Sequence, residues 1–287
     1  MPPPIVDGVA PAAAQGLDAD GVLQLFPTQT GSSFRLGSGD PNDTPALVIE
    51  KNARATRHGE GAVRFWSVAA YALDYSSGGT GKTIRLHIHA SGGQQELTWQ
   101  TQHGFLSSPR DLKNQEFTVY VRVHGIFDVR RAAVTLKIRG GKHTKDDGDL
   151  ASCTMITFSP AGSPAVTRFG KELTHPEYDY VKLEPMFAAS LEEDRWVGLK
   201  LVSYTPATDA GRVVNRLYVD DAPFDGAGRP ANHFRLFSEY VDVEGRSTGR
   251  YTKLADWGGW QTTLRTDGVS ELDFAIVSVR EIAAPTR

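Results

Sequence analysis

Phe117-Thr118-Val119-Tyr120-Val121-Arg122-Val123 and Val134-Thr135-Leu136-Lys137-Ile138-Arg139 decide the fold, because apolar and polar side chains alternate along both segments. Successive side chains of a β-strand point to opposite faces, so this alternation predicts strands with one buried and one polar face. Ile84-Arg85-Leu86-His87-Ile88-His89 repeats the pattern. Amphipathic strands of this kind are typical of antiparallel sheets.

Strand patterns continue to the end of the chain, and no apolar period of 3.6 residues lasts longer than two turns. The further strand candidates are 154–158, 196–204, 213–219, 233–241, 262–265 and 272–281, and only 185–193 suggests a short helix. The 29 glycines and 16 prolines fit many short elements joined by turns. The sequence therefore predicts an all-β, antiparallel two-sheet sandwich as one domain over residues 17–287.

The N-terminal residues 1–16 differ from the rest of the chain. Pro2, Pro3, Pro4 and Pro11 prevent a helix, and the segment has little apolar surface to bury, so we expect an extended arm. Its lack of a basic region followed by an apolar run argues against a secretory signal. We therefore expect a cytoplasmic or virion-associated protein, or an extracellular one whose signal was removed.

Charge and composition exclude several classes of protein. Thirty-one Lys and Arg against 34 Asp and Glu give a net charge of −3, which argues against a general nucleic-acid binder. No apolar run approaches the ~18 residues of a membrane span. Cys153 is the only cysteine, so an intrachain disulfide is excluded.

Basic and aromatic residues concentrate in three segments that strand pairing would bring together. They are Lys137, Arg139, Lys142 and His143 near one strand end, Arg168, Lys171, His175 and Tyr178 in a later segment, and Lys200 and Tyr204 on one face of strand 196–204. Arg and Lys pair with carboxylates or sulfates, and aromatic rings cover the apolar face of a pyranose. These residue types predict the binding of an acidic polysaccharide. The alternative is a solvated sheet face whose cations suppress edge pairing.

The same residue types suit β-elimination of a uronic acid. This reaction needs a cation to neutralise the carboxylate and a Tyr or His to move the proton, with the phenolate of a Tyr base favoured by nearby cations. The catalytic candidates are Arg139, His143, His175, Tyr178, Lys200 and Tyr204, and the substrate-binding candidates are Lys137, Lys142, Arg168, Lys171 and Trp257. Trp257 is a candidate stacking platform, whereas Trp260, just before a strand, is expected to plug the core.

Three other motifs resemble cofactor sites, and each has a simpler explanation. His87 and His89 have a metal-ligand spacing, but Glu96 is misplaced as an acidic partner even with His103 as a third histidine, so we predict no metal there. Asp146-Asp147-Gly148-Asp149 and Asp40-Pro41-Asn42-Asp43 are candidate Ca²⁺ ligands, with solvated acidic turns as the default interpretation. Ser76–Thr83 leads into a strand rather than a helix, so a hairpin turn explains it better than a nucleotide site does.

Several segments taken in order resemble the concanavalin A-like family of lectin-like and polysaccharide-lyase-like jelly rolls. They are Leu25-Phe26-Pro27-Thr28, Ile138-Arg139-Gly140-Gly141-Lys142-His143-Thr144, Arg168-Phe169-Gly170-Lys171-Glu172 with His175-Pro176, Arg195-Trp196-Val197-Gly198-Leu199-Lys200, and Val277-Ser278-Val279-Arg280-Glu281-Ile282. The resemblance spans residues 22–282 and implies a concave sheet that receives a glycan. Lyases of this architecture use an Arg, an amide or His, and a Tyr, for which Arg139, His143, Lys200 and Tyr204 are the counterparts that the resemblance implies.

Three functions follow from these observations. The first is a carbohydrate-binding protein that recognises an acidic polysaccharide, and the second is a polysaccharide lyase. The third is a phage or virion structural protein, a homo-oligomer or particle component assembled through the 1–16 arm. Binding requires only a groove, whereas a lyase also needs a proton-transfer set, so binding is the first choice.

Overall fold

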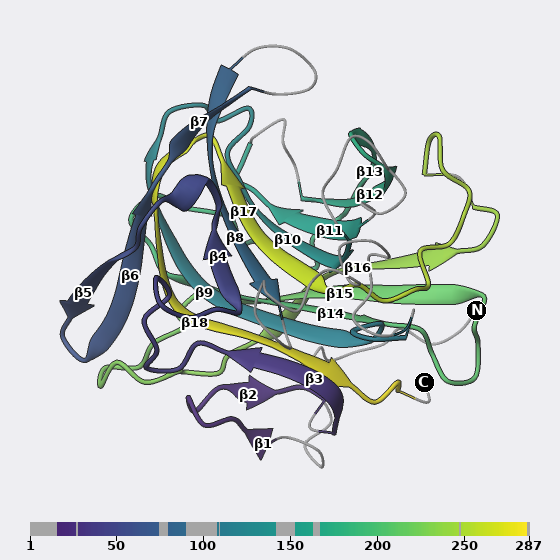
Figure 1. Cartoon of the computed structure of the whole chain (residues 1–287), viewed down its shortest axis with the longest axis horizontal. Helices are drawn as coiled ribbons and strands as arrows, with labels where there is room; N and C mark the ends of the chain where they lie inside the picture. The colour runs from purple at the N-terminus through teal and green to yellow at the C-terminus, as the bar shows by residue number, and fades with distance from the viewer. Residues whose placement is uncertain are drawn as a thin grey trace.

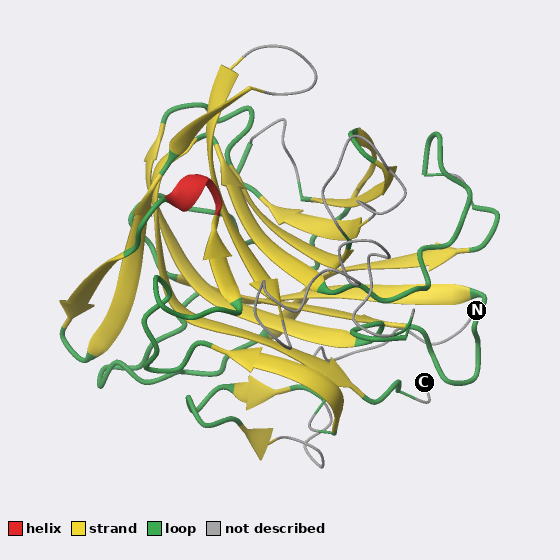
Figure 2. Cartoon of the chain, in the orientation of Figure 1, coloured by secondary structure: helices red, strands yellow, loops and turns green. Residues whose placement is uncertain are grey.

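The computed structural model describes residues 16–26, 28–74, 80–89, 108, 110–141, 153–162, 167–246 and 248–285. Nearly all of its regular structure is β-strand (Figures 1 and 2), which confirms the predicted fold class. The described residues form two antiparallel sheets of eight strands, packed face to face as a jelly-roll sandwich, and a separate two-stranded ribbon.

Sheet I has the strand order β13-β12-β11-β10-β17-β8-β4, and β7 also pairs with β8. Its strands are β4 (Leu47–Ile49), β7 (Tyr71–Asp74), β8 (Thr80–His89), β10 (Ala133–Gly140), β11 (Cys153–Phe158), β12 (Arg168–Thr174), β13 (Glu177–Lys182) and β17 (Gln261–Asp267). The predicted strands 84–89 and 134–139 thus lie two strands apart, with β17 between them.

Sheet II has the strand order β16-β15-β14-β9-β18-β6-β5, and β3 also pairs with β18. Its strands are β3 (Gln29–Arg35), β5 (Thr56–Glu60), β6 (Val63–Ala69), β9 (Gln115–Ile126), β14 (Val197–Tyr204), β15 (Arg212–Asp220), β16 (Arg235–Val243) and β18 (Val269–Ile282). The pairing of β9 with β18 places chain segments about 150 residues apart side by side, as Leu272 opposite Val123 shows (Figure 1).

The main core lies between the sheets and consists of the apolar positions of the alternating strands. Leu86 and Leu136 from sheet I and Val119, Leu199 and Phe274 from sheet II are fully buried in it. The alternating polar positions on the same strands face outward. A ligand can bind an outer face only where other parts of the chain leave it uncovered.

The outer face of sheet II is covered by the chain's own residues 16–26. This segment contains the ribbon of β1 (Gly16–Leu17) and β2 (Leu23–Gln24), and its Val22 and Leu25 pack in a second apolar cluster with Tyr120 and Tyr204. Of the predicted arm at residues 1–16, residues 1–15 lie outside the described residues and Gly16 belongs to β1.

The short helix predicted over 185–193 is wrong. Main-chain N–H groups of this segment bond to the sheets instead of to one another: Met186 donates to Phe237 O at 2.8 Å and Leu191 donates to Ser159 O at 3.1 Å. Among the described residues the one helical element is a 3₁₀ turn at Glu50–Asn52, drawn red in Figure 2.

Candidate functional site

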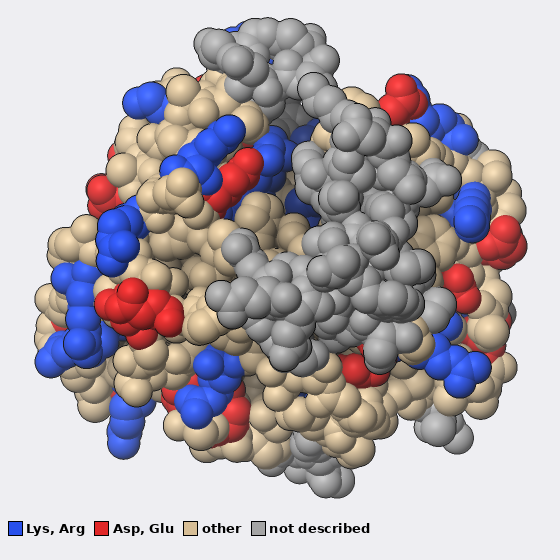
Figure 3. All heavy atoms as spheres, in the orientation of Figure 1, with Lys and Arg blue, Asp and Glu red and all other residues tan. Residues whose placement is uncertain are grey.

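A pocket opens on the outer face of sheet I, where β8, β17, β10 and β11 lie side by side. Its lining residues are Arg85, His87, Lys137, Gly140, Gly141, Cys153, Gln261 and Thr263. The side chains of Arg85 and His87 reach this face because the intervening Leu86 enters the core. Figure 3 shows Lys and Arg side chains within a hollow of the surface over these strands.

Two largely buried cations give the pocket its positive charge. The side chains of Arg85 and Lys137 are only 14% and 11% exposed. Arg85 Nη1 lies 3.1 Å from Glu50 Oε2, but the buried Nε of Arg85 has no hydrogen-bond partner in the described part of the chain. A buried donor left without a partner costs free energy.

His87 lines the same pocket and belongs to a hydrogen-bonded network. Its Nδ1 lies 2.8 Å from Gln261 Nε2 and 3.0 Å from Thr263 Oγ1, and its Nε2 lies 3.8 Å from Glu50 Oε2. Nδ1 of His87 therefore faces Gln261 and Thr263, and its Nε2 faces Glu50.

Glu50 holds this network together from the 3₁₀ turn. It also accepts a hydrogen bond from Tyr71 Oη at 3.0 Å. Burial alone would raise the pKa of Glu50, but the His87 hydrogen bond and the Arg85 charge outweigh burial and lower it to about 2. Glu50 is therefore an ionised carboxylate that orients both Arg85 and His87.

A second polar cluster adjoins the pocket on β10, β11 and β12. Lys137 Nζ lies 3.1 Å from Glu172 Oε2 and 3.3 Å from Tyr178 Oη, and His175 Nδ1 lies 2.6 Å from Glu172 Oε1. Cys153 Sγ is 3.4 Å from the same carboxylate. These contacts bring together three of the predicted site residues: Lys137, His175 and Tyr178.

The expectation of a phenolate at Tyr178 is wrong for this arrangement. Burial raises the pKa of Tyr178 to about 12, and the nearby Lys137 charge, which lowers the pKa, does not compensate. Tyr178 is thus a neutral phenol near neutral pH, able to donate a hydrogen bond. Burial likewise raises the pKa of the Cys153 thiol to about 12, so this cysteine stays protonated.

Aromatic rings continue the polar face to the edge strand β13. The rings of Tyr178 and Tyr180 are parallel within 1° with centroids 5.8 Å apart, and the guanidinium of Arg168 lies 3.7 Å from the Tyr180 centroid. Tyr180 is 40% exposed. Arg168, a predicted substrate-binding residue, therefore lies at the rim of the same outer face as the pocket.

Arg139 and Lys171 do not lie on this face, contrary to the sequence-based interpretation. A register shift between Lys137 and Gly140 and a φ of +56° at Arg139 turn its side chain into the sandwich. There it bonds Ser203 Oγ at 3.3 Å and the carbonyl of Trp257 at 2.9 Å, and burial lowers the pKa of Arg139 to about 10. Lys171, completely buried, pairs with Asp242 at 2.8 Å.

Lys200 and Tyr204 lie on the opposite outer face of the molecule, on sheet II. Lys200 Nζ bonds Glu116 Oε1 at 2.6 Å and is 1% exposed. Tyr204 is buried against Phe26, with ring centroids 5.8 Å apart. The expected single site joining Arg139, Lys200 and Tyr204 is therefore wrong, because the core separates the two sheets and residues 16–26 close over Lys200 and Tyr204.

The remaining predicted residues divide between the core and segments that are not described. Trp260 is 5% exposed and packs in the core, as expected, while Trp257 is half-buried with Lys253 Nζ 5.0 Å from its ring. His89 does not share the exposure of His87, because it is buried against Trp260 at 4.6 Å. Lys142 and His143, with Glu96, His103 and the 146–149 acidic turn, lie outside the described residues.

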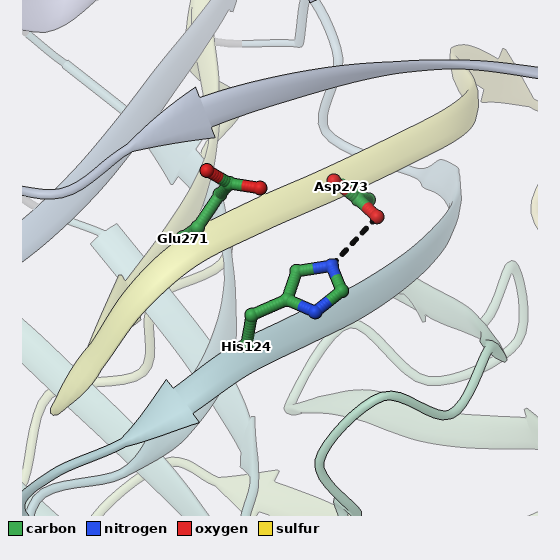
Figure 4. A group of neighbouring side chains, drawn as sticks. All are labelled: His124, Glu271 and Asp273. Atoms are coloured by element: carbon green, nitrogen blue, oxygen red, sulfur yellow. Dashed lines mark hydrogen bonds and ion pairs between the residues drawn. The ribbon is translucent and has the colours of Figure 1, made fainter. Parts of the chain in front are cut away.

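His124, Glu271 and Asp273 form a cluster of possible metal ligands on sheet II (Figure 4). The Asp273 carboxylate already accepts hydrogen bonds from Arg122 Nε at 2.9 Å and from His124 Nε2 at 2.7 Å. Arg122 therefore supplies the positive charge that a metal would bring. The group is best described as a hydrogen-bonded ionic cluster.

Sequence analysis missed Arg85, Glu50, Gln261 and Thr263 as site residues. Arg85 had a usable signal, since it alternates with His87 on a strand already identified. Gln261 and Thr263 alternate in the same way on β17. The pairing of β17 with β8, which places Thr263 opposite His87, is a contact across 176 residues that single-strand patterns do not contain.

No protein-family model matches the chain, and no curated protein sequence does. Among solved structures, it is similar to the endo-β-1,4-glucuronan lyase of the fungus Trichoderma reesei, with 11% identity over 88% of this chain and 96% of that one and a TM-score of 0.49. It is also similar to the exoplasmic/lumenal domain of VIP36, with 10% identity over 85% of this chain and 88% of that one and a TM-score of 0.41. A third similar structure is the alginate lyase vAL-1 from a Chlorella virus, with 9% identity over 82% of this chain and 93% of that one and a TM-score of 0.44. At identities and TM-scores this low, the similarities carry no conclusion about the family or the activity of this chain.

Proposed function

We propose that the outer face of sheet I binds an acidic polysaccharide, with the pocket receiving the carboxylate of one uronate unit. The observation that carries this proposal is the pair of largely buried cations, Arg85 and Lys137, that line one pocket. A carboxylate in the pocket would make charge-assisted contacts with the Arg85 guanidinium and the Lys137 ammonium.

Polar groups around the pocket suit the rest of a sugar unit. Gln261 and Thr263 offer an amide and a hydroxyl to sugar hydroxyls, and Tyr178 and Tyr180 extend the face towards β13 with aromatic surface. The pocket lies on the same sheet face as the rings of Tyr178 and Tyr180, which favours a polymer over an isolated small molecule.

The test is a calorimetric titration of the full chain with a polyuronate and with the same polymer after its carboxyl groups have been reduced to alcohols. We expect binding of the polyuronate and at least ~10-fold weaker binding of the reduced polymer, the loss of one charge-assisted interaction. Equal affinity for both polymers, or none for either, would overturn the proposal.

A polysaccharide lyase is the second candidate, and the position of His87 favours it. A β-elimination would move the proton next to the uronate carboxylate to a base and break the bond to the leaving glycosidic oxygen, which takes up a proton. His87 has the residue type for the base, Arg85 and Lys137 would stabilise the carbanion-like charge on the carboxylate, and neutral Tyr178 could protonate the leaving oxygen. Nδ1 of His87 would have to be released from Gln261.

Ultraviolet absorbance separates the two candidates, because β-elimination creates an unsaturated uronate. A lyase would produce rising absorbance with the polyuronate, lost in His87→Asn while binding remains. A protein that binds the polymer without any rise in absorbance is a binding protein only.

A further inference from the structure

The turn between β9 and β10, residues 127–132, exposes two neighbouring apolar side chains. Phe127 is 53% exposed and Val129 is 49% exposed, and they are two of the five large apolar residues that are exposed in the described part of the chain. Single exposed apolar side chains are common, but two on one short turn form a patch that needs an explanation.

The turn is held in a fixed conformation. The N–H groups of Phe127 and Asp128 donate to Gly268 O at 3.1 and 3.3 Å, and the N–H of Ala132 donates to Asp128 O at 2.8 Å. Gly268 has a φ of +69°, and a Cβ there would lie 2.6 Å from Asp128 O, so only glycine allows this approach. The backbone thus keeps the two apolar side chains in water.

Three cations surround these apolar side chains. Lys82 Nζ lies 5.7 Å from the centre of the Phe127 ring, and the side chains of Arg130 and Arg131 are 80% and 48% exposed. All line one shallow depression, in which Asp128 is the acidic residue, 3.8 Å from both arginines. The patch therefore combines an apolar centre with a net positive charge.

We propose that this turn docks the protein on an anionic lipid surface. Phe127 and Val129 would enter the headgroup region, and Lys82, Arg130 and Arg131 would lie against lipid phosphates and carboxylates. An aliphatic side chain such as Val129 gains free energy in a bilayer boundary but little from a hydroxylated polymer, so the composition favours lipid over an acidic polysaccharide. The proposal is independent of the pocket on sheet I.

The test is co-sedimentation of the full chain with vesicles of phosphatidylcholine alone and of phosphatidylcholine mixed with phosphatidylserine. We expect partitioning on the order of tenfold stronger with the anionic vesicles, weakening as salt is added. Phe127→Ser and Arg130→Glu should each reduce it several-fold. Met186→Ser is the matched control, because Met186 is 59% exposed elsewhere and should leave binding unchanged.

Three results would overturn the proposal: no sedimentation with either vesicle, equal partitioning into both, or equal loss in Met186→Ser. Binding of a soluble polyuronate that Arg130→Glu abolishes, with no vesicle binding, would assign the turn to a polymer instead. Thermal melts of each variant show that the comparison is made between folded proteins.

Discussion

Arg85 and Glu50 form an ion pair of 3.1 Å at the wall of the pocket on sheet I, and this pair leaves the buried Nε of Arg85 without a partner in the described structure. The carboxylate holds the guanidinium in place through Nη1. Glu50 also contacts His87 and Tyr71, so one acidic residue organises this side of the site.

Replacing Glu50 by Gln should weaken polyuronate binding. It should also remove a contribution to the free energy of unfolding that depends on pH. The folded-state pKa of Glu50 is lowered to about 2, so its contribution to stability is complete above its ordinary pKa and is lost as pH falls towards about 2. Allowing for partial exposure, we expect Glu50→Gln to cost about 1–2 kcal/mol at neutral pH. Urea unfolding of wild type and Glu50→Gln at several pH values measures this difference in unfolding free energy. A difference that is as large at pH 2 as at neutral pH would contradict the prediction.

Lys200→Met should destabilise the protein without changing its affinity for the polyuronate. This change leaves Glu116 buried with Arg280 as its remaining cation, and breaking one partner of a buried ion pair typically costs about 3–5 kcal/mol. The polyuronate affinity should stay within about twofold of wild type, because Lys200 lies beneath residues 16–26 on sheet II. Calorimetry at a temperature where the variant is folded would reveal any larger loss, which would place Lys200 in the site after all.

The strands could be predicted from sequence because alternation at Val119–Val123 or Leu136–Ile138 is a local property. The sequence could not predict which outer face stays open. The strands of Lys137 and Lys200 have similar patterns, and only packing between distant segments covers the face that carries Lys200. Arg139 follows the alternation in sequence, but the bulge at its positive φ reverses its side chain. Three predicted residues, Lys137, His175 and Tyr178, did meet in one cluster, because β10 to β13 are consecutive neighbours in both sequence and sheet.

The ion pairs of His124 predict a contribution to stability that is lost as pH rises. It joins Asp194 and Asp273, and although burial lowers the pKa of His124, these two hydrogen bonds raise it above the ordinary value. The stabilisation is complete below the unfolded-state pKa and is lost as pH rises through the folded-state pKa. Melting temperatures of wild type and His124→Gln should converge above that pH. A gap that widens with rising pH would refute this assignment.

Gly259 should tolerate no side chain. A Cβ at this position would lie 2.4 Å from the carbonyl carbon of Arg139 and 2.5 Å from Gly140 N, so Gly259→Ala must separate the 253–260 segment from the bulge. We expect a loss of about 2–4 kcal/mol in unfolding free energy. Gly226→Ala is the control, since a Cβ there meets open space. Equal stability of the two variants would show that the bulge can move freely.

The most direct test of the pocket is the polyuronate affinity of Arg85→Met beside that of Arg216→Met. Arg216 is a matched control, a part-buried arginine paired with Glu239 at 2.5 Å on the outer face of sheet II. We expect Arg85→Met to bind ~10- to 100-fold more weakly, the loss of one charge-assisted hydrogen bond, and Arg216→Met to bind like wild type. Unchanged affinity in a folded Arg85→Met would contradict the assignment of the site to sheet I.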